Sequence, residues 1–102
     1  MTEQYGLPLA AIEKLRAVFK AHPKVKSVLL YGSRAKGNYR TGSDIDLCIE
    51  NEITLDELLK IDSEIDDLLL PWSVDLSLYQ KIENPQLQES IKKTGVLFYS
   101  AR

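Results

Sequence analysis

The stretch "LLYGSRAKGNYRTGSDIDLCIE", residues 29–50, joins two apolar runs through a polar bridge that contains Gly32, Gly37 and Gly42. The second apolar run carries two aspartates, Asp44 and Asp46, one residue apart. Ionised carboxylates are costly to remove from water. The fold and the function of this chain therefore depend on where these two carboxylates lie.

Residues 43–50 alternate between polar and apolar side chains, which is typical of a strand with one buried face. Successive side chains on a strand point to opposite faces. One face carries Ile45, Leu47 and Ile49, and the other carries Asp44, Asp46 and Cys48. The two carboxylates are therefore predicted to share the face that points away from the core.

Hydrophobic periodicity and end signals predict the other elements. These are a helix over 8–22, a mid-sheet strand over 25–31 covered on both faces, a loop over 32–42 with a short helical turn, a helix over 54–70, a strand over 73–79, a short helix between Asn84 and Gly95, and a strand over 96–100. A capping-box pattern from Thr54 to Glu57 marks the start of the second long helix. The pattern indicates an α+β domain with a mixed sheet of about four strands packed with helices.

Length and composition narrow the functional classes. The 102 residues fit one domain spanning 1–102, and the net charge of −2 provides no drive toward nucleic acid. A single cysteine and a single histidine exclude a multi-cysteine zinc site. No apolar run approaches the roughly 20 residues of a membrane span, and the N-terminus lacks the order of a secretory signal. We expect a cytoplasmic protein that binds neither membrane nor nucleic acid.

Three aspartates on strand faces are candidate metal ligands. Asp44 and Asp46 have Cα atoms about 6.5 Å apart in a strand, and Asp75 lies on the polar face of the strand over 73–79. An all-oxygen site suits Mg²⁺, and two such ions can stabilise an in-line phosphoryl displacement. Taken alone, the Asp44–Asp46 pair is equally compatible with a solvated strand edge, and Asp75 alone fits an exposed position on a half-buried strand better than a metal ligand.

The turn at Gly32 and Ser33 is a candidate phosphate-binding site. A glycine directly after a buried strand lets the backbone approach a phosphate, and Ser33 can add its hydroxyl. Arg34, and less strongly Lys36 and Arg40, could neutralise phosphate charge. Taken alone, the pair is compatible with an ordinary turn, and the basic residues with a solvated loop.

Two other phosphate and metal motifs are excluded by single positions. Gly32 and Gly37 have P-loop spacing, but Asn38 and Tyr39 stand where that motif requires Lys and then Ser or Thr. An EF-hand loop beginning at Asp44 would need a ligand where Cys48 stands.

Taken together, the strand, the Gly32-Ser33 pair, ten intervening residues, Asp44-Ile45-Asp46 and Asp75 form a specific pattern. The stretch from about Val28 to Tyr79 resembles the DNA polymerase beta-like nucleotidyltransferase superfamily. It is most similar to the minimal nucleotidyltransferase branch, whose small proteins pair with a helical HEPN partner.

This resemblance implies a role for each motif residue. Gly32 and Ser33 would hold the triphosphate, with Arg34 as a further nucleotide-binding candidate. Asp44 and Asp46 would ligate two Mg²⁺ ions, and Asp75 would complete the metal site and help to deprotonate the acceptor hydroxyl. The resemblance further implies ATP as donor, adenylylation of a HEPN toxin, and an antitoxin that forms a hetero-oligomer with it.

Two alternatives to catalysis stay open at this level. The same fold could bind a nucleotide and mask a HEPN partner without turnover, or an unrelated domain could carry solvated aspartates. The presence of all three carboxylates favours catalysis. The sequence identifies neither the acceptor nor the role of Tyr5, Trp72 and Tyr99 as core or partner surface.

Overall fold

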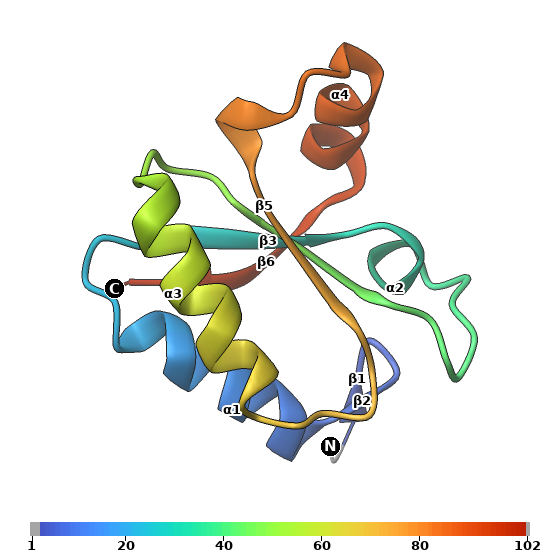
Figure 1. Ribbon diagram of the computed structural model, residues 1–102. Helices are drawn as coiled ribbons and strands as arrows, with labels where there is room; N and C mark the ends of the chain where they lie inside the picture. The colour runs from blue at the N-terminus through green and yellow to red at the C-terminus, as the bar shows by residue number, and fades with distance from the viewer. Residues whose placement is uncertain (1–2, 102) are drawn as a thin grey trace.

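The computed structural model describes residues 3–101, and the predicted helices and strands occur in it in the expected order (Figure 1). They are β1 (Glu3–Gln4), β2 (Leu7–Pro8), α1 (Leu9–Lys20), β3 (Ser27–Tyr31), α2 (Ser33–Lys36), β4 (Ile45–Ile49), α3 (Leu55–Asp66), β5 (Val74–Leu78), the single-turn 3₁₀ helix η1 (Tyr79–Lys81), α4 (Pro85–Thr94) and β6 (Val96–Ser100). The predicted α+β class is confirmed.

The sheet is mixed and has the strand order β5-β4-β3-β6. β3 runs antiparallel to both β4 and β6, whereas β4 and β5 are parallel. The connection from β4 to the parallel strand β5 passes through α3, as a parallel pair requires. This crossover brings the strand with Asp75 beside the strand with Asp46.

The hydrophobic core lies between one face of the sheet and two helices. Figure 1 shows α1 and α3 on one side of the sheet and α4 on the other. The predicted inward face of β4 is fully buried at Ile45, Leu47 and Ile49. It packs in one apolar cluster with residues such as Leu15 of α1 and Ile61 of α3. The alternation of residues 43–50 is therefore confirmed.

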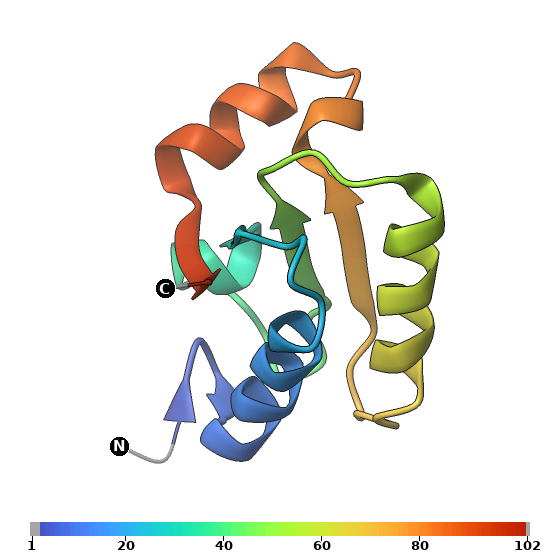
Figure 2. The ribbon, with the colours of Figure 1, turned by 90° about the vertical axis from the view of Figure 1, so that its left-hand side faces the viewer.

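The opposite face of the sheet is covered only in part. Val28 and Leu30 of β3 are buried, but Leu29 and Tyr31, which point to the opposite face, are half-buried. The expectation that this strand is covered on both faces is wrong at these two positions. The covering helix α4 is only 10 residues long, and Figure 2 shows it at one end of the sheet. The uncovered part of this face carries the predicted aspartates.

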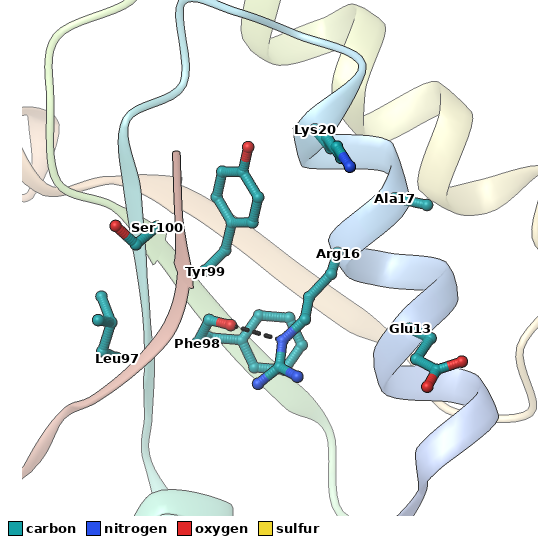
Figure 3. Close-up of a pocket in the computed structure, with 8 residues that line it drawn as sticks. All are labelled: Glu13, Arg16, Ala17, Lys20, Leu97, Phe98, Tyr99 and Ser100. Atoms are coloured by element: carbon teal, nitrogen blue, oxygen red, sulfur yellow. Dashed lines mark hydrogen bonds between the residues drawn. The ribbon is translucent and has the colours of Figure 1, made fainter. Parts of the chain in front are cut away.

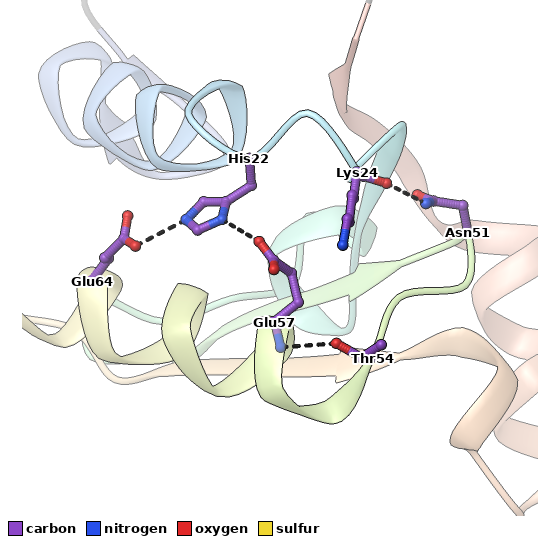
Figure 4. Close-up of polar contacts among 6 residues, drawn as sticks. All are labelled: His22, Lys24, Asn51, Thr54, Glu57 and Glu64. Carbon is purple, nitrogen blue, oxygen red and sulfur yellow. Dashed lines mark hydrogen bonds and ion pairs between the residues drawn. The ribbon is translucent and has the colours of Figure 1, made fainter.

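The second long helix starts where predicted and ends early. The Thr54 Oγ1 atom accepts a hydrogen bond from the backbone N–H of Glu57 at 3.2 Å. The Glu57 carboxylate does not complete the capping box but lies 2.6 Å from His22 Nδ1 (Figure 4). The helix ends at Asp66 rather than at residue 70, and Leu69 adopts a left-handed φ of 54°.

The hairpin of β1 and β2 and the turn η1 were not predicted. Each strand of the hairpin has two residues, too few for a periodic pattern. Within residues 3–101 no helix has both the length and the apolar character needed to cross a bilayer.

Candidate functional site

Asp46 and Asp75 lie side by side on the partly uncovered face of the sheet. They are direct partners in the register of the parallel pair β4–β5. Asp44 precedes β4 by one residue and is exposed, as is Asp75, whereas Asp46 is half-buried. The structure therefore brings the three predicted carboxylates to one region, with Asp46 at its centre.

Gly32 brings the predicted phosphate-binding turn against Asp46. Its φ of 76° and ψ of −156° lie in a region that is essentially restricted to glycine. A Cβ atom at this position would stand 2.4 Å from Asp46 Oδ2. The missing side chain therefore lets the carboxylate pack against the backbone of the turn, next to the start of α2.

The electrostatics of the carboxylate cluster are unfavourable without a cation. Partial burial, and then the charges of Asp75 and Asp44, raise the pKa of Asp46. Among residues 3–101, none of the ion pairs involves these three aspartates. Unpaired like charges held close together are a feature of sites that bind a positively charged ligand.

The three carboxylates do not by themselves form a complete metal cage. Within residues 3–101, no group of three or more His, Cys, Asp or Glu side chains is arranged to hold a metal ion as it stands. Mg²⁺ usually takes one or two carboxylates and completes its octahedron with water and substrate phosphates. The paired Asp46 and Asp75, beside a turn that could accept phosphate, fit that incomplete kind of site.

Ser33 and Arg34 have different environments in the short helix α2. Ser33 opens the helix and is half-buried, so its hydroxyl is a candidate phosphate ligand. Arg34 is buried, and its guanidinium donates to backbone carbonyl oxygens of Tyr5 and Ser43 at 3.0 and 2.7 Å. This placement does not support the predicted contact of Arg34 with a phosphate.

Tyr31 belongs to the site and was not identified from the sequence. It pairs directly with Asp46 across the β3–β4 register. Burial raises the pKa of the Tyr31 hydroxyl, and the charges of Asp75 and Asp46 act in the same direction. Its position one residue before Gly32, on the same sheet face as the aspartates, was the signal that could have revealed it.

A separate hollow of about 530 Å³ lies between α1 and β6 (Figure 3). It is lined by Glu13, Arg16 and Lys20 of the helix and by residues of the strand, and Arg16 Nε donates to Phe98 O at 2.8 Å. None of the predicted site residues lines it. The hollow therefore does not belong to the carboxylate site.

Comparison with known protein families agrees with the geometry. The family model described as "Polymerase beta, Nucleotidyltransferase" matches residues 13–102. Two proteins of Methanocaldococcus jannaschii, each provisionally named a protein adenylyltransferase, are 33% and 34% identical to this chain over 84 and 86 residues. Each of these matches covers 80% of this chain and 85% of the relative.

Two solved structures share the fold. One is a crystal structure of a toxin–antitoxin with AMP-PNP, with a TM-score of 0.69 and 22% identity. The other is a mutant of the toxin–antitoxin MntA-HpeT, with a TM-score of 0.66 and 18% identity. Each match covers 87% of this chain, and 73% and 72% of the two solved chains. At these identities the likeness concerns the arrangement of helices and strands.

Proposed function

Because this chain belongs to the polymerase beta nucleotidyltransferase family, we propose that it is a member of the minimal nucleotidyltransferase branch and that it transfers AMP from ATP to a protein hydroxyl with Mg²⁺ as cofactor. The name of its curated relatives supports a protein as acceptor. The nucleotide in one structural neighbour supports ATP as donor.

The proposal depends chiefly on the contact between the turn and the carboxylates. Asp46 lies against Gly32 on one side and beside Asp75 on the other. A triphosphate held at the Gly32 turn would therefore present its phosphates to a carboxylate-bound cation. Catalysis would then come mainly from positioning the reactants and stabilising the charge of the displacement.

Each site residue has a distinct part in this proposal. The backbone at Gly32 and the hydroxyl of Ser33 would hold the triphosphate. Asp44 and Asp46 would bind two Mg²⁺ ions, which when bound supply charge neutralisation at the phosphates. Asp75, on the exposed side of the pair, would complete the site and accept the proton of the acceptor hydroxyl. The oxygen of that hydroxyl would attack the α-phosphorus and release pyrophosphate.

We further propose that the acceptor hydroxyl belongs to a HEPN-class toxin, which this chain neutralises as its antitoxin in a hetero-oligomer. The toxin–antitoxin assemblies of both structural neighbours support such a partner. The active-site face leaves Asp44 and Asp75 exposed, so a second protein could reach the carboxylates.

The decisive experiment measures the intact mass of the copurifying or genetically adjacent partner after incubation with this protein, ATP and Mg²⁺. We expect the partner to gain the mass of one or more AMP groups, and we expect EDTA to prevent the gain. An Asp44→Asn variant should leave the mass unchanged. Asp62→Asn is a matched control, because Asp62 is an exposed aspartate of α3 outside the site.

An unmodified partner that still forms a stable complex would contradict adenylyl transfer and favour neutralisation by occlusion. A gain in mass that persists in the Asp44→Asn variant would instead contradict the assignment of the metal site.

A further inference from the structure

Arg34 is a buried charge in the helix that follows the Gly32-Ser33 turn. Its side chain is 2% exposed, and the guanidinium carbon lies 5.3 and 5.9 Å from the ring centroids of Tyr39 and Trp72. Within residues 3–101 no carboxylate forms an ion pair with it. A buried guanidinium without a counterion is costly unless its N–H groups are satisfied.

Backbone carbonyl oxygens satisfy the Arg34 guanidinium from two directions. Nε and one terminal nitrogen donate to Ser43 O at 3.1 and 2.7 Å, and that nitrogen also approaches Thr41 O at 3.4 Å. The other terminal nitrogen donates to Tyr5 O at 3.0 Å and to Gly6 O at 3.3 Å. The guanidinium therefore joins the turn of the N-terminal hairpin to the segment before β4.

The segment that Arg34 holds leads directly into the carboxylate strand. Ser43 is followed by Asp44, and the preceding loop contains two glycines, Gly37 and Gly42. Trp72 adds a second link, because its Nε1–H donates to Thr41 O at 3.2 Å. Trp72 itself lies three residues before Asp75, so these contacts connect the N-terminal ends of β4 and β5, the strands that carry Asp46 and Asp75.

Building on the nucleotidyl transfer proposed above, we propose that Arg34 is a positioning residue of that reaction. It holds the N-terminal end of β4 in place relative to the Gly32-Ser33 turn, and through Trp72 it also holds the N-terminal end of β5. The carboxylates and the phosphate-binding backbone then keep the spacing that in-line displacement needs. A misplacement of about 1 Å can lower the rate of such a reaction about 100-fold.

Lysine should not replace arginine in this role. The planar guanidinium presents five donors in fixed directions, whereas a lysine carries its three donors on one nitrogen. The contacts to the Tyr5 and Ser43 carbonyl oxygens come from three different guanidinium nitrogens, and a single ammonium nitrogen does not reproduce them together with the flat face that lies over the Tyr39 and Trp72 rings. Arg34→Lys thus keeps the charge and removes the geometry.

The test combines transfer kinetics with amide hydrogen exchange of Arg34→Lys. We expect kcat to fall about 100-fold while the KM for ATP stays nearly constant. We also expect faster exchange at the backbone amides of Ser43 and Ile45, which donate to Arg40 O and Ser73 O in the native segment. Both measurements belong well below the melting temperature of the variant.

Arg16→Lys is the matched control. Arg16 also donates to a backbone carbonyl and also contacts an aromatic ring, that of Phe98, but it lies beside β6 and outside the site (Figure 3). We expect this variant to lose stability with kcat and exchange at residues 43–45 unchanged. Trp72→Phe tests the second link, from Trp72 to Thr41. It keeps an aromatic ring and removes only the hydrogen bond to Thr41 O. We expect it to accelerate hydrogen exchange at the amides of Ser43 and Ile45, to a smaller degree than Arg34→Lys does.

Other results would assign Arg34 a different role. A raised KM for ATP, with kcat and exchange unchanged, would mean that Arg34 contacts a phosphate and would overturn the positioning role. A lower melting temperature alone, with kcat and exchange unchanged, would reduce Arg34 to a stabilising residue and would also overturn it. If the unmodified protein transfers no nucleotide, the proposed function fails. The exchange rates at Ser43 and Ile45 still decide whether Arg34 holds the N-terminal end of β4 in place.

Discussion

At Gly32 the absence of a side chain decides whether the Asp46 carboxylate can lie against the turn that is proposed to bind phosphate. Two separate constraints act on this residue: the positive φ of 76° and the space that Asp46 Oδ2 occupies. Two other glycines of the chain lack one or both of these constraints. Gly37 has a φ of 87° with open space around it, and Gly42 has neither constraint.

The three glycines allow a graded test by substitution with alanine. We expect Gly42→Ala to leave stability nearly unchanged, and Gly37→Ala to cost about 1–2 kcal/mol for the left-handed backbone alone. Gly32→Ala should cost more than Gly37→Ala, because the new Cβ also displaces Asp46. Denaturant unfolding measures the three values, and equal costs for Gly32→Ala and Gly37→Ala would contradict the close approach of Asp46.

We expect Asp46 to be needed for transfer activity but not for the stability of the fold. Because the neighbouring carboxylates disfavour its charge, Asp46→Asn should retain or slightly raise the melting temperature. Transfer activity should fall at least about 100-fold, because the proposed ligand between the turn and Asp75 is lost. Asp62→Asn serves again as the control. A variant that melts much earlier than the unmodified protein would indicate that Asp46 is a structural residue instead.

At the scale of elements, His22 links the end of α1 to α3. Its Nδ1 and Nε2 atoms lie 2.6 and 2.9 Å from carboxylate oxygens of Glu57 and Glu64 (Figure 4). Both acceptors are satisfied only when both ring nitrogens carry hydrogen, as in the imidazolium form. Burial alone lowers the pKa of His22, but the hydrogen bonds and charges of the two glutamates outweigh burial and raise it above its usual value.

This link makes the stability of the helix pair dependent on pH. Because the folded-state pKa of His22 is raised, its contribution is complete below the unfolded value of about 6.5 and is lost as the pH rises through the folded value. We therefore expect the free energy of unfolding to decrease across that window, and less so in Glu64→Gln. Since the chain has one histidine, NMR titration of its ring reports the pKa directly. A folded-state pKa below that of the unfolded chain would contradict this prediction.

At the scale of the whole molecule, α4 covers one end of the sheet face that carries the site. Ile91 of α4 and Cys48 of β4 are both buried, and Lys92 of α4 lies 4.0 Å from Glu50. Burial raises the pKa of the Cys48 thiol to about 11. The thiol is therefore protonated and shielded in the folded protein, and it reacts only when the fold opens locally around it.

The reactivity of Cys48 measures this opening without any engineered probe. We expect labelling by a thiol reagent at pH 8 to be at least about 100-fold slower in the folded protein than in denaturant. Ile91→Ala, which removes a buried side chain of α4, should accelerate the labelling and lower stability by about 2–5 kcal/mol. Equal labelling rates for the folded and denatured chains would show that Cys48 is accessible in the native state.

The sequence by itself determined the longer helices and strands of the sheet, apart from the end of α3, and the face on which the aspartates lie. Strand alternation is a local property with a period of two, so residues 43–50 could be assigned to opposite faces without a structure. The capping residue Thr54 and the helix starting near Asn84 were also local signals, and both are confirmed. The resemblance to the nucleotidyltransferases rested on such short-range motifs and agrees with the family that the comparisons show.

Only the tertiary structure decided which distant residues meet. Asp46 and Asp75 are adjacent because β4 and β5 pair in parallel, and Gly32 contacts Asp46 because β3 and β4 pair in register. Arg34 looked like a phosphate ligand from its place beside Ser33, yet its donors reach Tyr5 O, 29 residues away in the chain. A buried guanidinium takes whatever acceptors the packed chain brings to it, and no local pattern specifies those acceptors.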